Sequence, residues 1–460
     1  MQYATSDVIM KVLKFGGTSV GTVESLKNVK SIVESCSEPV IVVVSALGGF
    51  TDKLIATARM AENADMAYQS ELIAMRERHY TIIDSLVPVQ FRSEVRESVD
   101  ILFSKLSNIY HGICLLEELS TRSLDKVVSF GERLSSCIIS RIIESAELFD
   151  STSFIRTLRR FGKHVLDNDA TQSLIHATFD NVDFKVAVVP GFISKDADGR
   201  LTNLGRGGSD YTAAILAAAL DAHTLEIWTD VDGFMTADPR IVTGPKVIPE
   251  LSFTEAMELC NFGAKVIYPP TIYPVFHKNI PIYIKNTFNP AAPGTCIREE
   301  KSAPDTQLIK GVSSIVDSCL LTVKSADSTT TARTLNTLAR NGVSVLLVSH
   351  TSTSDSLTMA ITGAEIDSAI EALNKEFSAE IETGELQEFE IEKNLTTIAI
   401  VGDNLRQAGD ISSRLKLVLA STALQPIAFS QGVPETSISF VTSMDSRQRA
   451  LQTVHDAFCS

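Results

Sequence analysis

The stretch Lys14-Phe-Gly-Gly-Thr-Ser-Val20 follows an apolar run and ends it with two adjacent glycines. The run before it has the pattern of a buried strand, and the glycines interrupt that pattern. Because glycine has no Cβ, backbone N–H groups in such a turn can close around a phosphate, with Lys14 supplying a positive charge. Ser19 is predicted to cap a following helix. The alternative is an ordinary strand, turn and helix with a surface lysine.

A second strand ends in the same way. Residues 39–44 form a continuous β-branched run, which is typical of an interior parallel strand buried on both faces. Ser45, two further glycines and Thr51 follow, where a ligand crevice opens at the carboxyl ends of parallel strands. These two strand ends predict an open α/β sheet. Residues 53–118 are predicted to be helical.

The composition limits the classes of partner. The chain has 460 residues, of which 44% are hydrophobic and 21% charged, so two to four soluble domains are expected. No apolar run is long enough to span a membrane, no secretory signal is visible, and seven scattered cysteines contain no C-x-x-C. A net charge of −15 argues against nucleic acid or an anionic membrane as partner. We therefore expect a cytoplasmic protein with reduced thiols.

A carboxylate opens a helix in the middle of the chain. Gly131 precedes a long helical pattern and places Glu132 in its first turn. An acidic residue there is favourable with the helix dipole, and this is one reading of Glu132. The other is a carboxylate that accepts a substrate ammonium group.

A second glycine motif, Gly205-Arg-Gly-Gly-Ser-Asp-Tyr-Thr212, runs into an alanine-rich segment. Ser209 is predicted as the N-cap of this helix, whose start would form an anion site. Arg206 could bind a carboxylate or phosphate through two hydrogen bonds, while Asp210 could be a capping charge. The combination favours a functional site.

Later motifs are weaker alone. Thr229-Asp230 ends a short strand before turns that contain Asp238-Pro-Arg240, and Lys265 follows a glycine. Residues 299–310 are polar and are predicted to be a linker.

The remaining sequence contains a repeat of strand, helix, strand, strand and helix. The predicted elements of the first copy are residues 320–324, 331–341, 343–348 and 357–361, with a helix from 366. Those of the second are residues 397–401, 411–421, 426–429 and 438–441, with a helix from 447. Two small α+β modules in tandem fit a ligand sensor better than a second catalytic domain.

Taken together, the ordered motifs resemble those of aspartate kinases, of the amino-acid kinase fold, followed by two ACT modules. The resemblance rests on five motifs: Lys14-Phe-Gly-Gly-Thr-Ser-Val20, Ser129-Phe-Gly-Glu132, Gly205-Arg-Gly-Gly-Ser-Asp210, Thr229-Asp230 with Asp238-Pro-Arg240, and Phe262-Gly-Ala-Lys265. It implies an open, mostly parallel sheet sandwiched by helices, then two ferredoxin-like ACT modules. The expected domains are residues 1–298, 311–385 and 394–460, with boundaries that can interleave.

The resemblance also implies roles for individual residues. Those expected on the ATP side are Lys14, Gly16, Gly17, Thr229, Asp230, Met235, Arg240 and Lys265. Those expected on the aspartate side are Ser45, Thr51, Glu132, Arg206, Ser209 and Asp210, with Ser45 near the transferred phosphate. The catalytic set is Lys14, Asp210 and Lys265. No protein side chain is assigned to a metal, and Mg²⁺ is expected to arrive with ATP.

Two positions depart from the family pattern. The family often has Tyr where this chain has Met235, and usually a run such as His-Pro-Arg where it has Tyr268-Pro-Pro. The resemblance further implies a homodimer or larger assembly through the ACT modules and an amino-acid effector. Residues 324–331 could hold an ammonium group and a small polar side chain, or could be a solvated turn. Likeness to bifunctional aspartokinase–homoserine dehydrogenases favours threonine over lysine as effector.

Two rival functions are weighed against this resemblance, and the Arg206–Asp210 run with two trailing repeats speaks against the first, as the intact Lys14, Glu132, Asp210 and Lys265 speak against the second. One is a kinase of the same fold that acts on glutamate, acetylglutamate or carbamate, and the other is a non-catalytic amino-acid sensor. Because no G-x-G-x-x-G follows a strand, we expect no dehydrogenase activity from this sequence.

Overall fold

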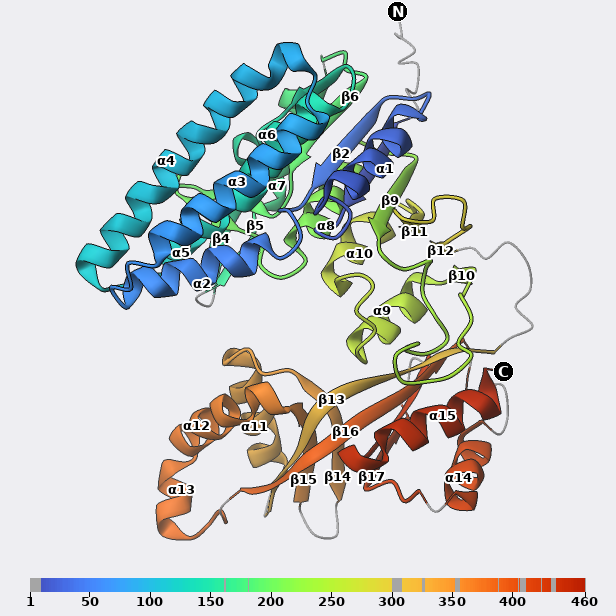
Figure 1. Ribbon diagram of the computed structural model, residues 1–460. Coiled ribbons are helices and arrows are strands. Elements are labelled where there is room, and N and C mark those ends of the chain that lie inside the picture. Colours follow the sequence, from blue (N-terminus) through green and yellow to red (C-terminus); the bar gives the residue numbers. More distant parts are fainter. Residues whose placement is uncertain are drawn as a thin grey trace, which may run out of the picture. The chain divides into compact units, whose positions relative to one another are not determined.

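The computed structural model describes residues 10–160, 163–180, 182–299, 308–324, 327–351, 356–387, 389–403, 405, 411–422, 424–431 and 436–459. The chain forms two compact units, Met1–Phe234 with Ile267–Glu299, and Met235–Val266 with Glu300–Ser460. Figure 1 labels elements of both where there is room. Among the described helices, none combines the length and apolarity needed to cross a membrane. Most of the predicted linker, residues 300–307, lies outside the described residues.

The first unit is built on a mostly parallel sheet with the strand order β12-β11-β9-β1-β2-β6-β3. Its strands are β1 (Lys11–Phe15), β2 (Val40–Val44), β3 (Ala146–Leu148), β6 (Val186–Pro190), β9 (Thr224–Thr229), β11 (Ile282–Asn286) and β12 (Thr295–Ile297). All neighbours from β11 to β3 are parallel, and β12 is antiparallel to β11. The predicted fold class is confirmed.

The two central strands are β1 and β2. All five residues of β2 are buried, as expected for a strand with both faces covered. The register pairs Phe15 with Val44, so β1 and β2 end side by side. The two glycine-containing loops that follow these strands therefore leave the sheet at the same edge.

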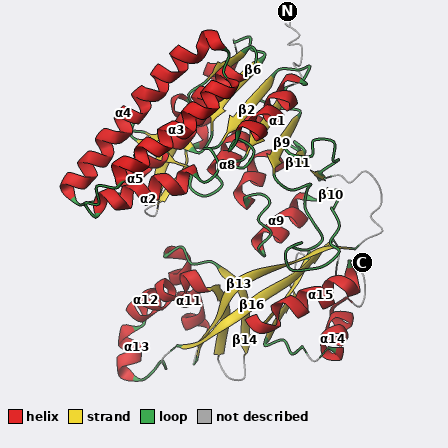
Figure 2. Ribbon diagram, in the orientation of Figure 1, coloured by secondary structure: helices red, strands yellow, loops and turns green. Residues whose placement is uncertain are grey.

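Helices cover this sheet, and α3 and α4 lie along one another (Figure 2). The helices of the first unit are α1 (Val23–Glu34), α2 (Phe50–Glu62), α3 (Tyr68–Leu86), α4 (Arg92–Leu116), α5 (Thr121–Val128), α6 (Phe130–Ile142), α7 (Asn168–Phe179), α8 (Gly208–Ala219) and α10 (Ile272–Phe276). Helices α2, α3 and α4 confirm the prediction for residues 53–118.

A small second sheet has the order β5-β4-β7-β8. Its strands are β4 (Arg156–Arg160), β5 (Lys163–Leu166), β7 (Ile193–Asp196) and β8 (Leu201–Asn203). The antiparallel pair β7 and β8 forms a hairpin with its turn at residues 197–200.

Short 3₁₀ turns occur at Val89–Phe91, Ser151–Ser153, Pro269–Thr271, Gly363–Glu365 and Met444–Ser446.

Two predicted helix caps are wrong. Thr22, and not Ser19, caps α1 through a capping box with Ser25, while the Ser19 hydroxyl lies 2.7 Å from that of Thr287. Gly207, and not Ser209, precedes α8, in a left-handed conformation with φ of 66°. In both cases the serine takes part in tertiary packing, because neighbouring strands and loops approach it more closely than the local sequence reveals.

The second unit contains the predicted repeat. Its elements are β10 (Glu250–Leu251), α9 (Phe253–Asn261), β13 (Ile309–Val323), α11 (Ser328–Arg340), β14 (Val345–Thr351), β15 (Ser356–Thr362), α12 (Ile366–Glu376), α13 (Ser378–Thr383), β16 (Glu390–Gly402), α14 (Ile411–Ser421), β17 (Ala428–Gln431), β18 (Ser437–Ser443) and α15 (Arg447–Phe458). The antiparallel sheet has the order β14-β15-β13-β16-β18-β17. The order β, α, β, β, α occurs twice, as predicted.

The two long strands β13 and β16 join the repeats. The first half of β13, up to Ile315, pairs with the second half of β16, and a register shift separates Ile315 from Ser318. The second half of β13 pairs with β15. The same two strands therefore contribute to both modules.

Residues 235–266 also belong to the second unit. Val312 N–H donates to Thr236 O at 2.8 Å, and Thr236 Oγ1 lies 2.8 Å from His455 Nε2 on α15. Ala237 and Val242 join the core of the second repeat. This segment, placed by sequence analysis within the catalytic domain, thus packs with β13 and α15.

Candidate active site

A cavity of about 360 Å³ opens in the first unit at the carboxyl ends of β1 and β2. Its walls come from the loops after these strands and from the first turns of α6 and α8. The lining includes these predicted site residues: Lys14, Gly17, Ser45, Thr51, Glu132, Arg206, Ser209 and Asp210. Fold topology therefore brings together groups from four separate stretches of the sequence.

A lysine and an aspartate form the charged centre of this cavity. Lys14 Nζ lies 2.5 Å from Asp210 Oδ1, and both side chains are largely shielded from solvent. The same amine lies 3.5 Å from the position that a Cβ on Gly16 would occupy. Asp210 thus holds the amine at the mouth of the glycine loop, where a positive charge can approach an anion.

Glu132 is a buried carboxylate on a second wall of the cavity. It is only 5% exposed, and its Oε1 accepts a hydrogen bond of 3.2 Å from the Ala46 backbone N–H. Its Oε2 has no hydrogen-bond partner among the described residues. Burial raises the pKa of Glu132 to about 8, against the opposing effects of the Ala46 N–H and the Lys14 charge. A cationic ligand group would satisfy this carboxylate.

Two glycine loops meet beside the lysine. A Cβ on Gly48 would lie 3.0 Å from Gly17 O, and a Cβ on Gly17 would lie 3.2 Å from Ala46 O. The two backbones are therefore in direct contact, which side chains at these positions would prevent. Gly17, Gly48 and Gly49 all line the cavity, so their backbones are available to an anionic ligand.

The third wall is the start of α8. Arg206 is exposed and lines the cavity, and Gly207 follows it in the left-handed region. A Cβ on Gly207 would lie 2.3 Å from the Cβ of Tyr268. The departure from the family pattern at Tyr268 thus packs directly against the loop that carries Arg206.

The other predicted residues do not line this cavity. Gly16 N–H donates to Trp228 O, and Thr229 and Asp230 follow at the end of β9, next to β1. Met235, Arg240 and Lys265 belong to the second unit. There the Arg240 guanidinium donates two hydrogen bonds to Asp238, at 2.9 and 2.7 Å, the Arg240 backbone N–H donates a third, and the side chain is otherwise exposed.

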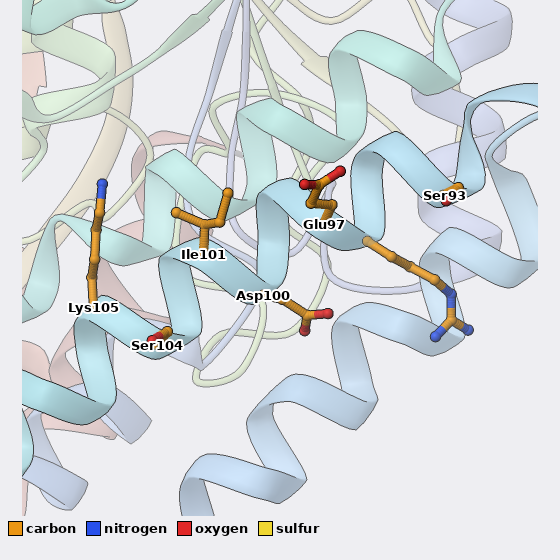
Figure 3. Close-up of a pocket in the computed structure, with 7 residues that line it drawn as sticks. Ser93, Glu97, Asp100, Ile101, Ser104 and Lys105 are labelled. Atoms are coloured by element: carbon orange, nitrogen blue, oxygen red, sulfur yellow. The ribbon is translucent and has the colours of Figure 1, made fainter.

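A second hollow lies along α4 in the first unit (Figure 3). Its side chains come from that helix alone and mix both charges with the exposed Ile101. Arg96 is already paired with Asp84, and Asp100 accepts a hydrogen bond from Tyr80. These pairs are typical of a solvated helix face. The hollow lacks the polar side chains that converge from several elements in the first cavity.

Several cavity residues were missed by sequence analysis. Asp52, in the first turn of α2, and Phe192, with φ of 66°, both line the cavity. Ala46 contributes a backbone N–H, which no side-chain pattern identifies. The position of Asp52 right after Thr51 was the signal that could have revealed it.

No group of three or more His, Cys, Asp and Glu side chains is arranged to hold a metal ion in the part of the chain that the structure describes. The cavity does contain Asp52 and Asp210. Mg²⁺ in kinases is commonly bound by one or two carboxylates together with substrate phosphates and water. The donor set therefore fits an ion that enters with a nucleotide.

Comparisons with known proteins agree with this architecture. The sequence matches the Amino acid kinase family over residues 10–286 and the ACT domain over residues 398–458. It is 33% identical over 463 residues to a bifunctional aspartokinase/homoserine dehydrogenase of Buchnera aphidicola, with 97% of this chain and 56% of that protein covered. The chain spans about half the length of the bifunctional relatives that it matches.

Two further comparisons extend over the full length of the relative. Lysine-sensitive aspartokinase 3 of Escherichia coli is 31% identical over 456 residues, covering 96% of this chain and 98% of that protein. The crystal structure of E. coli aspartokinase III with aspartate and ADP gives a TM-score of 0.85 at 29% identity, covering 98% and 100% of the two chains. The chain therefore belongs to the amino acid kinase family, as an aspartokinase homologue that carries an ACT domain.

Proposed function

We propose that the protein is an aspartate kinase, which transfers the γ-phosphoryl group of ATP to the β-carboxylate of L-aspartate. The observation that carries this proposal is one cavity in which Lys14, the two glycine loops, Glu132 and Arg206 converge. Such a cavity offers separate sites for an anionic phosphoryl group and for both charged ends of an amino acid. The full-length similarity to an aspartokinase supports this substrate over acetylglutamate or carbamate.

Opposite ends of aspartate are assigned to different walls. The Oε2 of Glu132, buried and without a partner in the described chain, would accept the substrate ammonium group. Arg206, exposed at the cavity, would bind the α-carboxylate through its planar guanidinium. Ser45, Thr51 and Ser209 would supply hydroxyl groups beside the reacting carboxylate.

The transfer itself needs no general base. The attacking β-carboxylate is already an anion, so the enzyme has to position the reactants and neutralise negative charge. Lys14, held by Asp210, would approach the transferred phosphoryl group from one side, and we assign Lys265 to the other. Gly16, Gly17, Thr229, Asp230, Met235 and Arg240 complete the proposed nucleotide site.

Mg²⁺ is proposed to enter bound to ATP. When bound, it neutralises phosphate charge. Asp210 and Asp52 are the described carboxylates of the cavity that could approach it. Asp210 would at the same time retain its contact with Lys14.

The direct test measures aspartate-dependent release of ADP, with hydroxylamine included to trap the acyl phosphate as a hydroxamate. Glutamate, N-acetylglutamate and carbamate serve as competing acceptors. We expect turnover with aspartate and a matching amount of hydroxamate. ADP release without hydroxamate, or turnover with another acceptor alone, would contradict the assignment, and no turnover with any acceptor would favour the sensor alternative.

Regulation is proposed to act through the ACT modules, divided near residues 311–385 and 394–460, which would also assemble the chain into a homodimer or larger oligomer. An effector must bind one global state better than the other, with a coupling of roughly 1–3 kcal/mol. Asp327, whose side chain accepts from Thr330 N–H at the start of α11, lies on the predicted effector loop. Residues 325–326 of that loop lie outside the described residues.

Threonine is our preferred effector, while the lysine-sensitive relative supports lysine. The test titrates each amino acid against kinase activity at sub-saturating aspartate, with light scattering to follow the oligomer. Inhibition by lysine alone would reject threonine. A monomer at assay concentration would reject assembly through the ACT modules.

A further inference from the structure

We propose that Arg78 is a positioning residue of the phosphoryl-transfer site. It lies on α3 and lines no part of the cavity. Its guanidinium links the two glycine loops and so orients the Gly49 backbone N–H toward the transferred phosphoryl group. This inference rests on the proposed kinase function.

The contacts of Arg78 join both loops through one nitrogen. Its Nη2 donates to Gly21 O at 3.0 Å and to Gly48 O at 2.9 Å. Gly21 ends the loop after β1, and Gly48 lies in the loop after β2. Burial lowers the pKa of Arg78, and in the described chain no carboxylate forms an ion pair with it. Its partners are two backbone carbonyl groups.

Beyond the hydrogen bond from Ser45 N–H to Phe15 O at their start, the two loops meet through glycine contacts. Gly17, Gly21 and Gly48 bring the two backbones into van der Waals contact, and a Cβ on Gly21 would lie 3.0 Å from Gly17 O and 3.3 Å from Gly48 N. Over the described residues, no backbone hydrogen bond joins residues 16–21 to residues 46–49. The hydrogen bonds that Arg78 donates to both loops are directional, whereas the van der Waals contacts between the glycines are not.

Peptide geometry transmits this contact to the cavity. The Gly48 carbonyl and the Gly49 N–H belong to one trans peptide group and point in opposite directions. With the carbonyl held by Arg78 behind the loop, the Gly49 N–H is directed to the other side, and Gly49 lines the cavity. An N–H fixed in this way can bind a phosphoryl oxygen without reorganisation.

Helix α3 is itself fixed against this region. His79, the residue after Arg78, is fully buried and packs edge-on against Phe50 at 4.7 Å between ring centroids. Phe50 is the first residue of α2, directly after the glycine loop. Arg78 thus extends from a helix that packs against the residue after the glycine loop, and such packing supports a positioning residue.

The test compares Arg78→Met, Arg78→Lys and Arg78→Ala. Arg78→Met should lower kcat roughly tenfold to a hundredfold, since a displacement of about 1 Å can cost that much. ADP binding, followed by fluorescence of Trp228, the single tryptophan, should change less than about twofold. Arg78→Lys retains an amine with several donors and should keep more activity than Arg78→Met. Added guanidinium should partly restore Arg78→Ala.

The matched control is Arg96→Ala, which removes a half-buried arginine from α4 and its ion pair with Asp84. It should leave kcat unchanged. An Arg78→Met protein with wild-type kcat would overturn the inference. So would loss of activity together with ADP binding in Arg78→Met, if Arg78→Lys were no more active and added guanidinium did not restore Arg78→Ala. Failure of the proposed function is distinct, because the wild-type protein would then show no aspartate-dependent turnover.

Discussion

Lys14 Nζ and Asp210 Oδ1 lie 2.5 Å apart, although one residue is on the first strand and the other opens α8. Both side chains are nearly enclosed, with exposed fractions of 11% and 13%. A charge in such surroundings is costly without a partner, and in this pair each group lies beside one of opposite sign. The pair fixes a positive charge beside the glycine loop before any ligand binds.

Replacing Lys14 tests the centre of the proposed mechanism. Lys14→Ala should lower kcat by roughly 10²–10³, because the lost charge matters most in the transition state. Aspartate affinity should change much less. Steady-state kinetics with both substrates measure the split, and a variant that retains more than about a tenth of the wild-type rate would contradict the role of Lys14.

Glu132 should make aspartate binding depend on pH. Because its pKa is raised to about 8, it is protonated at neutral pH and must lose a proton to pair with the substrate ammonium. The KM for aspartate should therefore fall as pH rises from about 6.5 to about 8.5. Calorimetry in buffers of different ionisation enthalpy should detect release of roughly one proton at neutral pH. Glu132→Gln should raise KM for aspartate and abolish this dependence.

The same group gives a prediction for stability. The folded state keeps the Glu132 proton up to about pH 8, whereas the unfolded chain loses it near the ordinary value of 4.5. The contribution of Glu132 to the free energy of unfolding is therefore complete below about pH 4.5 and is lost as pH rises through about 8. Urea unfolding should show wild type losing stability relative to Glu132→Gln between about pH 4.5 and about pH 8. Parallel curves would refute the raised pKa.

Binding by Arg206 should depend on the planar shape of its guanidinium as well as on its positive charge. Arg206→Lys keeps the positive charge but replaces a planar donor pair with a point charge. We expect a higher KM for aspartate and nearly unchanged KM for ATP. If the requirement for ATP rose instead, Arg206 would belong to the nucleotide side.

Two glycines with similar φ angles allow the effect of backbone strain to be separated from the effect of steric crowding. Gly207 and Gly199 have φ of 66° and 74°, but a Cβ on Gly207 would meet Tyr268 whereas one on Gly199 meets nothing within 4 Å. Gly199→Ala should cost about 1 kcal/mol from backbone strain, and Gly207→Ala roughly 2 kcal/mol or more from strain with overpacking. Thermal unfolding measures both. Equal losses would show that Tyr268 moves aside freely.

Thr236 should hold residues 235–247 in the second unit. Its Oγ1 contacts His455 Nε2 and accepts from Lys246 N–H at 3.0 Å. Thr236→Val leaves both groups without that partner, at an expected cost of roughly 1–3 kcal/mol in unfolding free energy. The control, Thr243→Val, alters an exposed residue of the same segment and should cost less than about 0.5 kcal/mol.

The sequence by itself determined the layout of the catalytic sheet and of the repeat. The continuous apolar run of β2, the glycines after β1 and the alanine-rich α8 each carry a local pattern. Such patterns reflect strand and helix periodicity and the conformational freedom of glycine, which act over a few residues. They therefore located the candidate site as well as the fold.

Only the tertiary structure decided how these elements are joined. The caps at Thr22 and Gly207, the bond between Glu132 and Ala46 N–H, and the link from Arg78 to both loops depend on distant stretches of chain. So does the association of residues 235–266 with α15. The physical reason is that burial, desolvation and hydrogen bonding at these positions arise when separate segments of the chain meet. The sequence of one segment does not specify which other segment packs against it.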